Sequence, residues 1–178
     1  NVVIDQYPRA GEKISPDVKV NLLVSSGTAE GDRKMPDVTG QSIDLCFDLL
    51  LAKGLSVKEE IVKTGDINSS GLIAEQSIKA GTAINAGDTV TLKINYYNLT
   101  EHPYSAYELV EYTIPSGGES GLYEGVIEDN HSKRIRYSAN AGPGQKISFV
   151  FHRVGNAKVY IDRDKNNIRL LKINVDEF

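Results

Sequence analysis

The chain has 178 residues, of which 40% are hydrophobic, 25% are charged and 7% are aromatic, and its formal net charge is −4. This composition is typical of a folded protein of one or two domains and not of a disordered or collagen-like chain. A negative net charge argues against a broad basic surface for nucleic acid and against docking on anionic lipid. The apolar stretches are too short to span a membrane. A single cysteine, Cys46, cannot form an internal disulfide.

An internal repeat organises the N-terminal half of the chain. Residues 5–24 align without a gap on residues 75–94, and six of the twenty aligned pairs are identical. The identical pairs are Gln6/Gln76, Ala10/Ala80, Gly11/Gly81, Ile14/Ile84, Val20/Val90 and Leu22/Leu92. Each copy contains a short extended run, an Ala-Gly turn and an alternating apolar run, which together predict a β-hairpin. We expect the first copy to lack its front half.

The second copy also has a helical segment. Residues 43–53 carry apolar side chains at helical spacing, Ser42 is a suitable N-cap, and Gly54 is a suitable left-handed stop. Residues 55–62 are then predicted to form a strand. The second copy is therefore predicted to be a helix followed by three strands.

The last third of the chain has a different pattern. Six short strand-like runs are separated by polar, Gly-containing or Asn-containing turns, with no helical periodicity, which predicts a small β-sandwich. The six runs are residues 107–114, 122–128, 133–139, 146–153, 157–162 and 168–175. The predicted organisation is the end of one repeat (1–27), a linker (28–34), a complete repeat (35–97), a second linker (98–105) and a β domain (106–178).

The repeats resemble the PASTA repeat. The match rests on Pro-Asp-Val-Thr-Gly at residues 36–40, Cys46 and Leu50 in the helix, Gly-Leu at 54–55, and the Gln76 to Gly81 turn. It covers about residues 1–97. Two positions depart from the pattern, because Ile78 replaces the proline that the first copy keeps and Cys46 stands where the family usually has Ala.

Residues 106–178 are similar to the Ig-like β domain that follows the repeats in some PASTA-containing kinases, through short runs such as Val159-Tyr160-Ile161-Asp162. Together these observations predict an α+β fold class. PASTA repeats in tandem, each with one helix packed on a three-stranded sheet, would precede a small all-β Ig-like sandwich.

The chain lacks the motifs of an enzyme. Lys63-Thr64-Gly65 spells one box of the penicillin-recognising enzymes, but the Ser-x-x-Lys nucleophile motif is missing, and no kinase signature occurs. Residues 162–166 begin like a calcium loop, but the required Gly and Glu are replaced by Asn167 and Ile173. A polar turn is therefore favoured there. We expect no catalytic residue, no metal and no cofactor in this segment.

The PASTA resemblance implies an extracytoplasmic segment that recognises peptidoglycan fragments, tethered by a membrane helix upstream. The candidate ligand-binding residues are Arg9, Glu75, Gln76, Ser77 and Lys79. Arg or Lys could pair with a stem-peptide carboxylate and Glu with an amine, although a structural or merely solvated role is open for each of the five.

Two other functions are open. The repeats could be a structural spacer whose terminal β domain binds another protein, since tyrosines are frequent at interfaces. The chain could also be the non-catalytic C-terminal region of a penicillin-binding protein.

Overall fold

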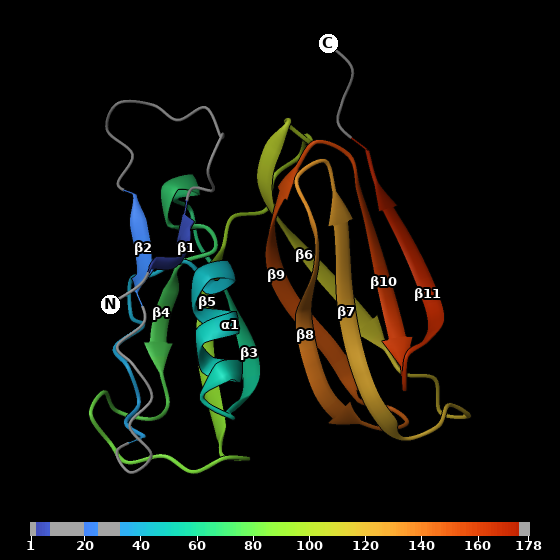
Figure 1. The fold of residues 1–178 in the computed structure, drawn as a ribbon. Coiled ribbons are helices and arrows are strands. Elements are labelled where there is room, and N and C mark those ends of the chain that lie inside the picture. Colours follow the sequence, from blue (N-terminus) through green and yellow to red (C-terminus); the bar gives the residue numbers. More distant parts are fainter. Residues whose placement is uncertain (1–2, 8–19, 25–32, 175–178) are drawn as a thin grey trace.

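The computed structural model describes residues 3–7, 20–24 and 33–174 (Figure 1). It is mostly β, with 54% of the described residues in strands and 9% in helices. The elements in chain order are β1 (Val3–Tyr7), β2 (Asn21–Val24), α1 (Ile43–Ala52), β3 (Ser56–Lys63), the 3-10 turn η1 (Ile67–Ser69), β4 (Ile73–Gln76), β5 (Thr89–Tyr96), β6 (Ser105–Thr113), β7 (Gly121–Asp129), β8 (Lys133–Ala141), β9 (Lys146–Val154), β10 (Ala157–Arg163) and β11 (Asn166–Ile173).

The predicted α+β class, with tandem repeats of one helix on a three-stranded sheet, is wrong. Within the described residues there is one α-helix, α1, and the strands form four separate sheets. The described part of the first copy contributes only the β1–β2 hairpin. The reason is that strands dominate the chain, since the six from β6 to β11 follow one another with no helix between them.

The repeat unit, from Lys34 to Tyr96, is built around α1 and the sheet β3-β5-β4. Strand β3 runs parallel to β5, and β4 runs antiparallel to it. Alternate residues of β5 point inward, so that Val90, Leu92 and Ile94 are fully buried in one core with the apolar face of α1. The helix ends where Gly54 adopts a left-handed conformation with φ +79°, as the sequence predicted.

The β1–β2 hairpin has the same register as β4–β5. Gln6 lies opposite Leu22 in the first hairpin, and their repeat equivalents Gln76 and Leu92 lie opposite each other in the second. The internal repeat is therefore also a repeat of strand pairing. The environments differ, because Leu22 is 54% exposed whereas Leu92 is fully buried beneath α1.

The β unit, residues 105–173, has two facing layers. The sheet β11-β10-β7-β8 forms one layer and the pair β6–β9 forms the other, and residues of both layers share a core. Each of the six predicted strand-like runs is a strand, with ends that differ by at most two residues. The Ig-like assignment and the predicted domain bounds stay predictions.

The two units lie side by side, with the edge strand β3 of the repeat unit against β8 and β9 of the β unit (Figure 1). Val150 of β9 is fully buried in the core of the repeat unit, and Tyr107 and Leu109 of β6 pack against that core. The hydrophobic core of the repeat unit is therefore completed by the β unit. No helix in the described ranges is long and apolar enough to cross a membrane.

Candidate binding surfaces and the domain junction

The predicted ligand-binding residues of the second hairpin lie on and just after β4. Glu75 is exposed and forms an ion pair with Lys93 of β5, with 2.6 Å between Lys93 Nζ and Glu75 Oε2. The Glu75 carboxylate raises the pKa of Lys93 through this hydrogen bond and through its charge. Lys79 is exposed. Arg9 lies outside the described residues.

Gln76 ties the end of β4 to the segment before α1, and Ser77 ties it to β5. The Gln76 amide oxygen accepts from the Val38 N–H at 2.8 Å, and its amide nitrogen donates to the carbonyls of Pro36 and Ile78 at 3.0 and 2.7 Å. The Ser77 hydroxyl accepts from the Thr91 N–H at 2.8 Å. Both side chains thus have internal structural partners, and their role toward a ligand stays a prediction.

A buried charge cluster joins the two units. Arg136 of β8 is 1% exposed, and its Nη1 lies 2.7 Å from Oε1 of Glu59 on β3. Its Nε lies 3.6 Å from Oδ1 of Asp44 in the first turn of α1. The guanidinium also sits over the Phe47 ring, 4.8 Å from its centroid. One cation of the β unit therefore meets two carboxylates of the repeat unit in a water-poor interior.

The same two carboxylates satisfy the backbone of β9. Glu59 Oε2 accepts from the Val150 N–H at 3.0 Å, and Asp44 Oδ2 accepts from the His152 N–H at 2.9 Å. Burial raises the pKa of Glu59 above its ordinary value, while the charge of Arg136 and the Val150 N–H act in the opposite direction. Because isolated buried charges are costly, this pairing fixes how β9 sits on the repeat unit.

Tyr107 of β6 makes a second connection. Its hydroxyl lies 3.0 Å from the Ser42 hydroxyl, and its ring packs directly on Gly71. Burial raises the pKa of Tyr107 well above its ordinary value. Ser42 occupies the N-cap position of α1 as the sequence predicted, but it makes no side-chain capping bond. Its hydroxyl instead contacts the Tyr107 hydroxyl of the β unit.

Sequence reasoning missed these junction residues. A signal was present at Glu59, which occupies an inward position on β3 in step with the apolar residues Val57 and Ile61. A charged residue in the buried register of a strand points to a buried partner. Nothing in the sequence showed that the partner would be Arg136, 77 residues away.

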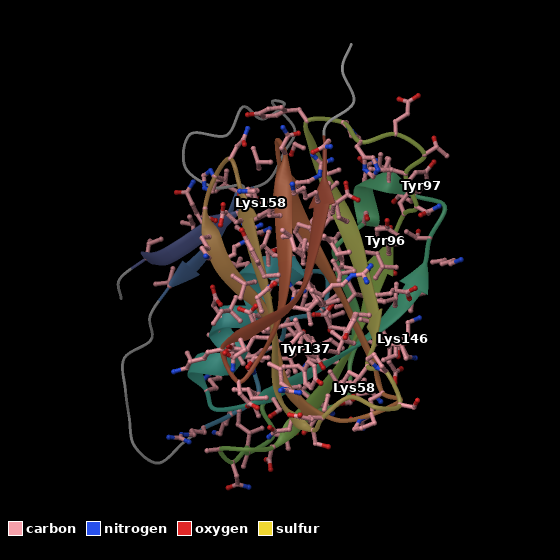
Figure 2. The ribbon with its side chains drawn as sticks, turned by 90° about the vertical axis from the view of Figure 1, so that its right-hand side faces the viewer. Lys58, Tyr96, Tyr97, Tyr137, Lys146 and Lys158 are labelled. Carbon is pink, nitrogen blue, oxygen red and sulfur yellow. The ribbon has the colours of Figure 1, made fainter. Side chains whose placement is uncertain are left out.

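A cleft of about 430 Å³ opens between the units, beside the charge cluster. One wall comes from β3 and the start of β5, and the other from β8, β9 and the turn between them. Its lining residues include Ser56, Lys58, Thr89, Tyr137, Asn140, Gln145, Lys146 and Ser148. Figure 2 shows Lys58, Tyr137 and Lys146 near one another in the lower half of the view.

The cysteine and the calcium-loop-like turn noted in the sequence have structural roles. Cys46 is fully buried in α1, and burial raises its pKa to about 12. The turn at residues 162–167 joins β10 to β11. In the described part of the chain, no group of three or more His, Cys, Asp or Glu side chains is arranged to hold a metal ion.

The PASTA domain family matches residues 33–96. These residues are a PASTA domain. PASTA domains are non-catalytic binding regions, which confirms for residues 33–96 the prediction that the segment is not an enzyme. The predicted resemblance to PASTA-containing kinases is also confirmed.

Two curated relatives are kinases of clostridia. A probable serine/threonine-protein kinase of Clostridium perfringens is 32% identical over 120 residues, which are 62% of this chain and 17% of the relative. A probable serine/threonine-protein kinase of Clostridium acetobutylicum is 26% identical over 98 residues, which are 55% of this chain and 15% of the relative. The chain therefore spans less than a fifth of the length of these relatives.

One solved structure is similar over 98% of this chain and 62% of its own. It is the extracellular region of the Ser/Thr kinase PrkC from Staphylococcus aureus, with 16% sequence identity and a TM-score of 0.33. This value is too low to support an argument about fold. The PASTA domain and the kinase relatives support a binding or sensor segment in an extracytoplasmic location.

Proposed function

We propose that this chain is the extracytoplasmic sensor part of a longer, membrane-anchored serine/threonine kinase and that it recognises peptidoglycan fragments. The observation that carries the proposal is the PASTA domain at residues 33–96. The two clostridial kinases support a kinase as the whole protein and argue against the alternative of a penicillin-binding protein. The membrane helix would lie upstream of Asn1.

The exposed charges of the second hairpin suit a stem peptide. Lys79 offers an ammonium group to a carboxylate, and Glu75 offers a carboxylate to an amine. The Glu75–Lys93 pair is exposed, so a ligand can replace either partner at little cost. Gln76 and Ser77 would contribute by shaping this edge, and Arg9 is the equivalent of Lys79 in the first copy.

The test is retention of residues 1–178 by purified sacculi at low and moderate salt. The intact chain should be retained, and the double variant Glu75→Gln/Lys79→Gln should be retained severalfold less. Lys158→Gln on β10 is the matched control, because it removes a half-exposed, ion-paired lysine from the β unit. Absence of retention of the wild-type chain would overturn the proposal.

A structural spacer is the second candidate function, and the buried junction favours it. The Arg136 cluster and the shared core join the repeat unit directly to the β unit. The angle between the units therefore does not depend on residues 97–104 alone. A spacer predicts one rigid shape by small-angle X-ray scattering and no retention on sacculi. In that case the β unit would present a surface to a protein partner.

A further inference from the structure

The cleft between the units is lined by both apolar and polar groups, and its polar groups are mostly hydroxyls, amides and amines. Hydroxyls come from Ser56, Thr89 and Ser148, and side-chain amides come from Asn140 and Gln145. A shallow groove along the β8–β9 turn lies next to the cleft and shares the lining residues Asn140 and Gln145 with it. Such a lining matches a ligand that is rich in hydroxyl and amide groups and longer than a single small molecule.

The charged side chains that face the cleft with exposed heads are cationic. Lys58 stands on the repeat unit and Lys146 on the β unit, with side chains 66% and 53% exposed. The acidic lining residue is Glu59, whose carboxylate is buried and already held by Arg136 and the Val150 N–H. The exposed charged groups that line the cleft are therefore two ammonium groups, in a chain whose net charge is −4.

Both lysines have exchangeable partners. Lys58 lies 3.9 Å from Glu60, and Lys146 lies 2.6 Å from Glu111. These pairs are about half-exposed, and surface pairs of this kind contribute little to stability. A ligand carboxylate can therefore displace Glu60 from Lys58, or Glu111 from Lys146, with little loss of folding stability.

The floor of the cleft is rigid. The Tyr137 ring stacks on Phe149, with 5.6 Å between ring centroids and 23° between ring planes. Val57, which also lines the cleft, is buried and belongs to the core of the repeat unit. Beneath the cleft, the Glu59–Arg136 pair fixes the distance between its walls. A preformed site loses less entropy when a ligand binds.

We propose that this cleft is a binding site for a carboxylate-bearing ligand with hydroxyl and amide groups, clamped between Lys58 of one unit and Lys146 of the other. The inference rests on the proposed function and adds a site at the junction of the two units, apart from the hairpin residues Glu75 and Lys79. A bound ligand would then contact both units at once.

The test is titration of the full chain with a soluble disaccharide tetrapeptide, followed by calorimetry and by backbone amide NMR. The free tetrapeptide and the unsubstituted disaccharide are parallel probes that show which part of the ligand carries the carboxylate contact. The variant Lys58→Gln/Lys146→Gln removes both charges. The matched control is Lys158→Gln, since Lys158 is 50% exposed, ion-paired and distant from the cleft (Figure 2).

We expect the double variant to bind about tenfold more weakly or worse, because two charge-assisted bonds are lost. The control should bind within twofold of wild type. In the wild-type chain, amide shifts should concentrate at Ser56, Asn140 and Gln145. This mapping uses the wild-type chain alone, so it remains informative if the double variant does not fold. Folding of the double variant is checked by its thermal midpoint in circular dichroism.

Three results would overturn the inference. They are equal affinity of the double variant and wild type, amide shifts confined to residues 75–79, and no binding of any probe at millimolar concentration. Sacculus retention of the wild-type chain is scored separately. Retention with an unaffected double variant would reject the cleft and leave the proposed function intact, whereas no retention would reject the proposed function.

Discussion

Replacing Arg136 with Met would leave two carboxylates buried at the domain junction without their cation. The side chains of Glu59 and Arg136 are each 1% exposed, so water cannot replace the lost partner. Removing one member of a buried pair typically costs about 3–5 kcal/mol. Among the described residues, Arg136 Nε and Nη2 have no hydrogen-bond partner. The native pair is thus incompletely satisfied, and we expect a loss of about 3 kcal/mol.

This loss is measurable by urea unfolding of the full chain, followed by circular dichroism and tyrosine fluorescence. For a protein of this size, it corresponds to a decrease in thermal midpoint of about 10 °C. Lys93→Met is the control, because it breaks an exposed ion pair with Glu75 on the repeat unit. The control should leave the thermal midpoint unchanged.

The Arg136→Met variant should also depend on pH in a defined direction. Burial already raises the pKa of Glu59, and loss of the guanidinium raises it further. A carboxyl with a raised folded-state pKa loses stability as pH rises between its unfolded and folded values. The deficit relative to wild type should therefore shrink from pH 7 to pH 5. A deficit below about 1 kcal/mol that is equal at both pH values would refute the role of the pair in holding the units together.

Three further changes probe the packing. Gly71→Ala should destabilise the chain more than Gly81→Ala in urea unfolding, because both glycines have positive φ but only at Gly71 would the new methyl overlap the Tyr107 ring. Equal losses would contradict this contact. Leu92→Ala should cost about 2–5 kcal/mol of unfolding free energy, since it opens a cavity beneath α1. Cys46 should resist a thiol reagent at pH 8 until the chain is unfolded, because burial raises its pKa to about 12; rapid labelling of the native chain would show that the helix opens.

Local features of the fold were predictable from the sequence. Short strand-like runs between turn signals located all six strands of the β unit, and helical spacing located α1 to within one residue of its end. The repeat of residues 5–24 at 75–94 anticipated the matching register of two hairpins. These features depend on side-chain periodicity and turn chemistry over short stretches, which the sequence displays directly. The predicted fold class was wrong because short-range patterns locate single elements but do not show how strongly strands outweigh helices, and 54% of the described residues are in strands against 9% in helices.

The candidate site was only partly predictable. Gln76 was recognised as a residue that recurs in both copies, and its bracing role follows from the loop that it spans. Ser42 was placed at the start of the helix, but its hydroxyl bonds to Tyr107 from another unit. The cleft was not foreseen, because Lys58 and Lys146 are 88 residues apart in the sequence and line the same cleft only once the units pack together.

The sequence by itself determined the repeat, the strands and the PASTA identity of residues 33–96. Only the tertiary structure decided how the two units join, because a buried charge is stable only where an opposite charge and hydrogen-bond donors meet it. Arg136 lies 77 residues from Glu59 and still farther from Asp44 along the chain, and neither spacing nor periodicity relates it to them. Their pairing follows from the packing of β3 and α1 against β8 and β9, and the cleft beside them is a consequence of that same packing.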